Sequence, residues 1–199
     1  MEIKELVILL QSCAKTRDVC KGTQIHTTIL RRGLLEKSAR LGTTLIHMYV
    51  KCGLFSKAKQ VFEELSTRAV APWTSLIGGY VQDGQSHEAI DCFYRMQCEG
   101  LYPNEVTYIC ILKACGSVRS MDNGRRVHDA IVSRGLLEKN AMLGNALVHM
   151  YAKCGNFVHA YQVLRDLPAR DEVSWSILIV GYVQEGLCHE ALHCLAHMQ

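Results

Sequence analysis

The sequence repeats itself with a period of 102 residues. Residues 33–53 read GLLEKSARLGTTLIHMYVKCG and residues 135–155 read GLLEKNAMLGNALVHMYAKCG, identical at 15 of 21 positions. Trp73 recurs as Trp175 with the same spacing. A long period kept without insertions predicts an array of stacked units, each of which packs only on its neighbours. Such an array offers an extended surface for a polymer rather than one enclosed catalytic pocket.

The bulk composition allows a packed core and an anionic partner. Hydrophobic residues make up 49% of the chain, which is enough for a continuous core, and the net charge is +3. A nonspecific, purely electrostatic binder of nucleic acid is normally more basic than this. The charge therefore allows a nucleic-acid partner without demanding one.

Six of the ten cysteines recur with the period, among them Cys92 as Cys194, and none forms a C-x-x-C pair. Cys13 recurs as Cys115, and Cys52 recurs as Cys154. This spacing predicts equivalent packing positions, where a free thiol behaves as a small apolar side chain, and it implies a reducing compartment. The sequence has no N-x-S/T sequon and no run of about 18 apolar residues, so we expect neither secretion nor membrane spanning.

Apolar residues at helical spacing predict two helices joined by a turn within residues 70–104. The first stripe follows i, i+3, i+4 and i+7 and consists of Trp73, Leu76, Ile77 and Tyr80. Gly84 predicts the turn, and the second stripe consists of Ala89, Phe93 and Met96. The same pattern fits 39–69 and 105–140, and in 105–140 we predict the turn at Gly124. The whole chain is therefore predicted to be an all-α solenoid of helix–turn–helix repeats.

The motifs resemble those of plant pentatricopeptide repeat proteins of the PLS class. PWTSLIGGYVQDGQSHEAI at 72–90 and VSWSILIVGYVQEGLCHEAL at 173–192 are similar to P-type motifs. LGNALVHMYAKCG at 143–155 resembles the S-type motif, and TYICILKACGSVRSMDNGRRVH at 107–128 resembles the L-type motif. The resemblance covers essentially the whole chain and implies a right-handed superhelix. The implied units are L-type 3–38, S-type 39–69, P-type 70–104, L-type 105–140, S-type 141–171 and an incomplete P-type 172–199.

The resemblance implies binding of single-stranded RNA, with about one base read by the fifth and last residues of each repeat. The implied readers are Thr43 with Ala69, Thr74 with Asn104, Asn145 with Asp171, and Ser176. Lys51 and Lys153 resemble the family's phosphate-contacting lysine, which Gln82 and Gln184 replace in the P-type units. The L-type units carry Val7 with Ser38 and Ile109 with Asn140, and an aliphatic fifth residue offers no polar group to a base edge. We expect these units to space the strand.

The family's code converts these residues into a footprint. Thr with Asn favours adenine, Asn with Asp favours uracil, and Ser176 alone suggests a purine. Thr43 with Ala69 departs from the family's pattern and leaves its base the least defined. The implied footprint is 5′-purine-A-N-U-purine-3′, where N faces unit 105–140. An Asn amide both donates and accepts, as the edge of uracil requires, and Asp at the last position can fix its orientation.

One motif matches a catalytic sequence pattern but fits a structural role better. His189, Glu190 and His193 spell H-E-x-x-H, the helical motif of zinc proteases, but the earlier copy has Asp91 in place of the second histidine. The deaminase signature H-x-E with P-C-x-x-C is absent from this sequence. We therefore expect no catalytic residue, no metal site and no cofactor, and we expect both tryptophans to pack in the core.

The sequence thus predicts a sequence-selective binder of single-stranded RNA that directs organellar RNA editing or processing. Its expected partners are RNA and editing or processing factors, without a membrane or a small-molecule substrate. The resemblance implies a mitochondrion or chloroplast, and the acidic start, MEIKELVILL, does not resemble a transit peptide. The alternative is a scaffold that holds a peptide or helix in the concave groove, and an enzyme is a third hypothesis. Alternation of polar and aliphatic fifth residues favours RNA, because a peptide scaffold has no reason to alternate in that way.

Overall fold

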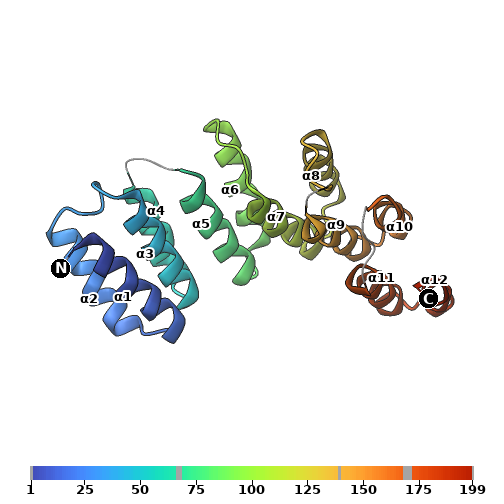
Figure 1. Cartoon of the computed structure of the whole chain (residues 1–199), viewed down its shortest axis with the longest axis horizontal. Helices are drawn as coiled ribbons and strands as arrows, with labels where there is room; N and C mark the ends of the chain where they lie inside the picture. Colours follow the sequence, from blue (N-terminus) through green and yellow to red (C-terminus); the bar gives the residue numbers. More distant parts are fainter. Residues whose placement is uncertain (1, 66–68, 139, 168–171, 199) are drawn as a thin grey trace. The chain divides into compact units, whose positions relative to one another are not determined.

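A computed structural model describes residues 2–65, 69–138, 140–167 and 172–198 (Figure 1). These residues form twelve α-helices and no strand, which confirms the predicted all-α solenoid class. The helices divide into two compact units, Met1–Asn104 and Glu105–Gln199. None of the described helices is long and apolar enough to cross a membrane.

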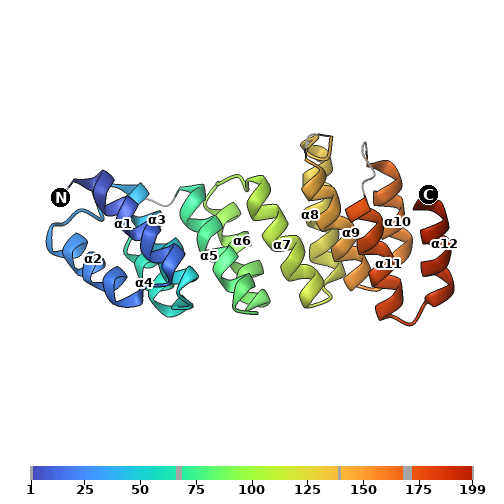
Figure 2. The ribbon, with the colours of Figure 1, turned by 60° about the horizontal axis from the view of Figure 1, so that its bottom comes forward.

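The first unit consists of three helix pairs. Its helices are α1 (Ile3–Thr16), α2 (Val19–Arg31), α3 (Ala39–Lys51), α4 (Phe55–Glu64), α5 (Val70–Gln82) and α6 (Ser86–Cys98). Each odd-numbered helix packs on the even-numbered helix that follows it, and α3 also packs on α1 and α5. The first helices of successive pairs therefore form one layer, with the second helices behind them (Figure 2).

The second unit repeats this arrangement. Its helices are α7 (Glu105–Ser117), α8 (Met121–Ser133), α9 (Ala141–Lys153), α10 (Phe157–Asp166), α11 (Glu172–Gln184) and α12 (Cys188–Met198). Helix α9 packs on α7 and α11, and α10 packs between α9 and α11. The apolar stripes face inward, so that Tyr108, Leu147 and Leu178 are fully buried. Side chains of neighbouring pairs thus share one continuous core within the unit.

The prediction of a turn at Gly124 was wrong. Gly124 lies inside α8, and a Cβ atom there would overlap Sδ of Met150. The glycine lets α8 and α9 approach closely at this point, because a side chain here would displace the end of the Met150 side chain. The turn lies at Val118–Ser120 instead, where Arg119 adopts a left-handed conformation with φ of 51°. A non-glycine residue rarely adopts this conformation, so the sequence carried no signal for the turn.

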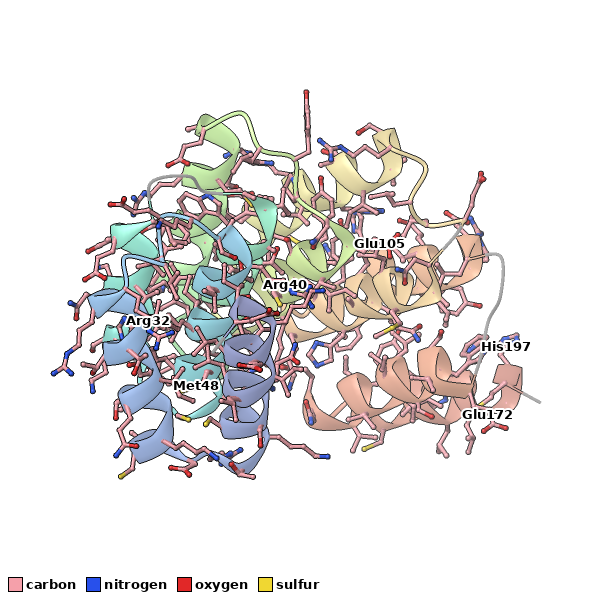
Figure 3. The ribbon with its side chains drawn as sticks, turned by 60° about the vertical axis from the view of Figure 1, so that its left-hand side comes forward. Arg32, Arg40, Met48, Glu105, Glu172 and His197 are labelled. Carbon is pink, nitrogen blue, oxygen red and sulfur yellow. The ribbon has the colours of Figure 1, made fainter. Side chains whose placement is uncertain are left out.

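The same packing device occurs 102 residues earlier in the first unit. Gly22 lies inside α2, and a Cβ atom there would meet Sδ of Met48 at 2.7 Å. Met48, labelled in Figure 3, is fully buried in this unit. Arg17, which corresponds to Arg119, also adopts a left-handed conformation, with φ of 55°. The repeat therefore preserves a close helix approach and its adjoining turn, in addition to the apolar stripes.

The cysteines are free thiols, and those that recur with the period occupy equivalent positions. Cys13 and Cys115 are both buried, and Cys52 and Cys154 are both half-buried. Burial raises the pKa of the Cys115 thiol to about 12, with the nearby Cys154 adding to the effect. A thiol with so high a pKa stays protonated at neutral pH and packs as an apolar group, which confirms the structural interpretation.

Candidate nucleic-acid interface

The predicted base-reading residues at the fifth position of each unit all lie on the first helix of a pair. The aliphatic Val7 is 3% exposed, so it is covered by protein and offers nothing to a base. Thr43, Thr74 and Asn145 are half-buried, and Ser176 is exposed. The polar readers are therefore at least partly accessible while their backbones are fixed in helices. Such preorganised side chains can meet a ligand at low entropic cost.

Both predicted threonine readers bond to their own helix. The hydroxyl of Thr43 donates to the carbonyl oxygen of Ala39 at 2.9 Å, and that of Thr74 donates to the carbonyl oxygen of Val70 at 3.0 Å. A hydroxyl has one hydrogen to donate and two lone pairs that accept. Each threonine in this state presents its oxygen mainly as an acceptor.

Asn145 is held differently, by a residue of the next helix pair. The hydroxyl of Ser174 on α11 donates to Oδ1 of Asn145 on α9 at 2.5 Å. Ser174 is 1% exposed, and the bond to the half-buried Asn145 is partly buried. The oxygen end of the amide is therefore engaged within the protein, and the NH₂ end is left as the group to present to a ligand.

The last-position readers that the structure describes, Ala69 and Asn104, lie at the start of the following first helix. Ala69 is the N-cap of α5 and has no side-chain group to bond, and Asn104 is exposed immediately before α7. Asp171 lies outside the described residues. Asn140 caps α9: its Oδ1 accepts from the backbone N–H of Leu143 at 3.3 Å, and its Nδ2 donates to Glu105 at 2.5 Å. Because helices favour Ser, Asn and Asp at the N-cap, this position selects polar residues even without RNA.

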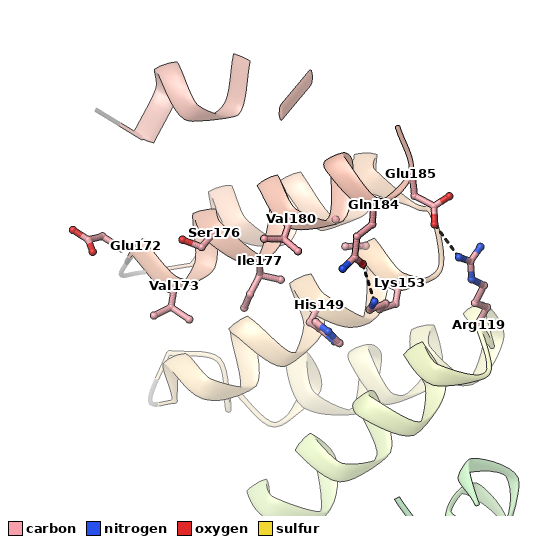
Figure 4. Close-up of a pocket in the computed structure, with 12 residues that line it drawn as sticks. Arg119, His149, Lys153, Glu172, Val173, Ser176, Ile177, Val180, Gln184 and Glu185 are labelled. Carbon is pink, nitrogen blue, oxygen red and sulfur yellow. Dashed lines mark hydrogen bonds and ion pairs between the residues drawn. The ribbon is translucent and has the colours of Figure 1, made fainter. Parts of the chain in front are cut away.

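A groove of about 540 Å³ lies between α9 and α11 and contains two of the predicted residues (Figure 4). Ser176 lies on one side of it, and Lys153 lies at the end of α9. The ammonium of Lys153 donates to Oε1 of Gln184 at 2.8 Å. The lysine and the glutamine that the sequence placed at equivalent positions of successive units are therefore neighbours. Together they form a row of hydrogen-bond donors along one edge of the groove.

The residues that line the groove include a pair of opposite charges, Arg119 and Glu185. The guanidinium of Arg119 pairs with the carboxylate of Glu185 at 2.8 Å, with side chains 64% and 35% exposed. An exposed pair of this kind contributes little to stability. Arg119 is paired with a carboxylate, whereas the hydrogen-bond partner of Lys153 is the neutral amide of Gln184. Lys51, the predicted counterpart in the first unit, is exposed at the end of α3.

His149 lines the groove one helical turn before Lys153. Burial lowers the pKa of its imidazole, and the charges of Lys153 and Lys113 lower it further. An unperturbed histidine titrates near 6.5, so a lowered pKa keeps this ring neutral at pH 7. A neutral imidazole can donate one hydrogen bond and accept another, and it adds no charge to the groove.

Apolar residues beside the readers were missed by the sequence analysis. Val173 and Val180 line the groove and are 55% and 52% exposed, and Met142 on α9 is 67% exposed. The sequence analysis named only the apolar stripes and did not consider these residues. The available signal was their register, because each falls off the buried stripe of its helix. Exposed apolar groups beside polar readers can pack against the flat face of a base.

The residues of the H-E-x-x-H motif do not form a set of metal ligands in the described part of the chain. His189 and Glu190 are exposed on α12, and the rings of His193 and His197 lie 4.6 Å apart. No group of three or more His, Cys, Asp or Glu side chains among the described residues is arranged to hold a metal ion.

Family models for the pentatricopeptide repeat match most of the helical pairs. The model described as the PPR repeat family matches residues 73–117. The model described as the PPR repeat matches residues 43–69, 145–171 and 173–199. These segments together span more than half of the chain.

Sequence relatives come from Arabidopsis thaliana. One is a chloroplastic pentatricopeptide repeat-containing protein, 36% identical over 194 residues that cover 98% of this chain and 31% of that protein. Another is a putative mitochondrial one, 35% identical over 191 residues that cover 96% of this chain and 30% of that protein. The chain thus spans about a third of the length of these relatives.

Solved structures share the fold. The pentatricopeptide repeat protein PPR10 from maize matches 100% of this chain and 29% of its own, with a TM-score of 0.80 and 18% identity. PPR10 in complex with an 18-nt psaJ RNA element matches with a TM-score of 0.77, over 100% of this chain and 30% of its own. The family models, the relatives and the stacked helix pairs agree: this chain belongs to the pentatricopeptide repeat family.

Proposed function

We propose that this chain binds single-stranded RNA and reads its sequence at about one base per repeat. The observation that carries the proposal is the alternation of the fifth residues on the first helices. Val7 and Ile109 are aliphatic, whereas Thr43, Thr74, Asn145 and Ser176 are polar, the first three half-buried and Ser176 exposed. Apolar residues at these positions would be consistent with packing or with peptide binding. Polar groups at the ends of half-buried side chains suit the edges of bases.

The hydrogen-bond states of Thr74 and Asn145 fit the bases that the family's code assigns to units 70–104 and 141–171. The oxygen of Thr74 can accept from the N6 amino group of adenine, and the amide of Asn104 can donate to N1. The NH₂ group of Asn145 can donate to O4 of uracil, and a carboxylate at Asp171 would accept from N3–H. Threonine is also one bond shorter than asparagine, which leaves room for a purine. These matches support the footprint 5′-purine-A-N-U-purine-3′.

Unit 105–140 is proposed to space the strand rather than read it. Its fifth residue, Ile109, has no polar group to offer. Both ends of the Asn140 amide are engaged, by the backbone of α9 and by Glu105. A last residue whose donor and acceptor are both used within the protein has little left for a base. This supports the N in the footprint.

The wider role follows from the relatives and is part of the proposal. The PLS class, the division into units 3–38, 39–69, 70–104, 105–140, 141–171 and 172–199, and a role in editing or processing rest on motif order and spacing. Named relatives are chloroplastic or mitochondrial, which supports an organellar transcript as the target. Because those relatives are about three times as long, we propose that the chain acts as part of a longer array.

The experiment that tests the function is fluorescence anisotropy of the chain with short RNAs that differ only at the base facing unit 141–171. We expect the RNA with uracil at this base to bind most tightly, and the DNA of the same sequence to bind less well. Binding without base preference would leave a general RNA clamp. No binding by a chain whose helices are intact by circular dichroism would favour a scaffold for a peptide or helix.

Replacing Lys153 with glutamine is expected to weaken RNA binding equally for all bases. The ammonium meets the phosphate backbone in this proposal, and phosphate contacts carry no sequence information. Loss of one such contact should reduce the slope of log Kd against log salt by about 0.7 for a single strand. Lys59→Gln on the second helix α4 removes the same charge away from the groove and should leave the slope unchanged. A change in base preference for Lys153→Gln would contradict the phosphate role.

A further inference from the structure

We infer that Arg119 is a second phosphate-binding residue of the groove, and that Glu185 occupies its guanidinium until the RNA backbone displaces the carboxylate. The inference rests on the proposed function and adds a cation that lies outside the family's lysine position. A carboxylate and a phosphate both offer a guanidinium two oxygens for paired N–H bonds. Glu185 therefore stands where a phosphate would bind, and it lowers the affinity of the groove for RNA.

The pair lies at the end of the groove that also contains the proposed lysine contact. One terminal nitrogen of the Arg119 guanidinium lies 2.8 Å from Oε1 of Glu185, and both residues line the groove together with Lys153 and Gln184 (Figure 4). Arg119 follows α7, Glu185 follows α11, and each of these helices packs on α9. The guanidinium thus reaches past the end of α9 to a helix pair that is not its neighbour.

Helix α7 has no cation at the position where α9 carries Lys153. Helices α7, α9 and α11 have 13 residues each and end at Ser117, Lys153 and Gln184. The hydroxyl of Ser117 donates to the carbonyl oxygen of Lys113 in its own helix at 3.0 Å. Arg119, two residues beyond the helix end, supplies the positive charge that α7 lacks there. Its planar guanidinium can bind a phosphate through two N–H groups at once.

The backbone at Arg119 gives an independent reason to assign a role to its side chain. Each of the six turns within a helix pair contains one residue with a left-handed φ, and four of them use glycine, with φ between 74° and 77°. The turn between α7 and α8 uses Arg119 instead, with φ of 51°. This conformation is unfavourable for a residue with a Cβ atom, and an ion pair whose side chains are 64% and 35% exposed contributes little to stability. The turn alone therefore does not account for an arginine at this position.

The same two charges recur in the first unit with the 102-residue period. Arg17 corresponds to Arg119, and Asp83 corresponds to Glu185. The side chain of Asp83 is one methylene group shorter, and its Oδ2 accepts from Nε2 of Gln85 at 2.6 Å. The second unit is therefore the place where the exchange of a carboxylate for a phosphate can be tested directly.

The first arm of the test measures stability without RNA. Arg119→Gly removes the ion pair and also relieves the left-handed backbone, so we expect the urea midpoint to stay the same or rise. Glu185→Gln should leave the midpoint unchanged, because exposed ion pairs contribute little to folding. A clearly lower midpoint in either variant would make the pair a structural link between helix pairs and would overturn the inference.

The second arm measures how RNA binding depends on salt. We expect Arg119→Gln to weaken binding and to reduce the slope of log Kd against log salt by about 0.7, without a change in base preference. The matched control is Arg165→Gln, because Arg165 is 65% exposed and also pairs with a carboxylate, that of Asp166 at 3.6 Å, but lies on the second helix α10. This control should keep the wild-type slope. An equal slope in wild type and Arg119→Gln would contradict the inference.

The third arm tests whether Glu185 restrains Arg119. We expect Glu185→Gln to tighten RNA binding about two- to fivefold, because no ion pair has to be broken. Glu172→Gln removes the same charge from the lining of the same groove and should tighten binding less. In an Arg119→Gln background the two carboxylate variants should have equal effects, because the guanidinium is gone.

The outcomes separate this inference from the proposed function. Equal effects of Glu185→Gln and Glu172→Gln in the wild-type background would overturn the role of Glu185. A wild-type chain that prefers uracil at unit 141–171 but keeps its salt slope in Arg119→Gln would overturn the inference and leave the function standing. A wild-type chain that binds none of the RNAs would overturn the proposed function itself.

Discussion

Trp73→Ala is expected to destabilise the first unit by about 3–5 kcal/mol, the cost of removing a large aromatic side chain from a packed core. Trp73 is 0% exposed, and its ring meets Phe62 edge-on at a centroid distance of 4.6 Å. The guanidinium of Arg95 lies over the indole at 5.6 Å. Urea unfolding followed by far-ultraviolet circular dichroism measures the loss as a lower midpoint.

The repeat supplies a matched control for this change. Trp175 occupies the equivalent position 102 residues later but is only half-buried, with Tyr161 edge-on at 6.2 Å. Trp175→Ala should therefore cost clearly less than Trp73→Ala. Trp73→Phe should also be mild, since it keeps most of the ring and removes an indole N–H that has no hydrogen-bond partner among the described residues. An unchanged urea midpoint together with lost RNA binding would instead make Trp73 a base-stacking residue.

The sequence predicted helices wherever one register served a single purpose. Trp73, Leu76 and Tyr80 recur at helical spacing, and all three are buried on one face of α5. The prediction at Gly124 was wrong because a glycine suits either a turn or a close approach between helices, and the local sequence does not distinguish the two. Met150, whose side chain lies against that glycine, is 26 residues away on α9. Only the packed structure shows that the two meet.

In the candidate site, too, some contacts could be predicted from the sequence and others could not. The row of Lys153 and Gln184 could be anticipated, because both residues stand at the same place in successive units and stacked units bring such places together. The bond between Ser174 and Asn145 could not, since it joins different places in two units and depends on the side-chain geometry between α9 and α11. Register predicts which helix faces the ligand. Donor and acceptor orientation requires the coordinates.

Asn145→Thr is expected to move the base preference of unit 141–171 from uracil to guanine. The amide NH₂ that donates to O4 of uracil is removed, and the shorter side chain leaves room for a purine. A threonine hydroxyl can donate to O6 of guanine, and a carboxylate at Asp171 would accept from N1–H. Each such pair discriminates by about 1–3 kcal/mol, so the ratio of the two Kd values should swing by about 100-fold.

The controls separate a change of reading from a loss of structure. Asn145→Ala removes the amide and supplies no new partner, so it should lose the uracil preference without gaining guanine. RNAs varied at the base facing unit 70–104 should still favour adenine in Asn145→Thr, because Thr74 and Asn104 are untouched. The two outcomes differ in what they establish. A change of preference at one base alone would establish both the function and the register of the strand. Only a residue that contacts a given base can change the preference for that base without changing the preferences at neighbouring bases. An Asn145→Thr chain that stays folded and still prefers uracil would remove Asn145 from the reading positions and with it the proposed register.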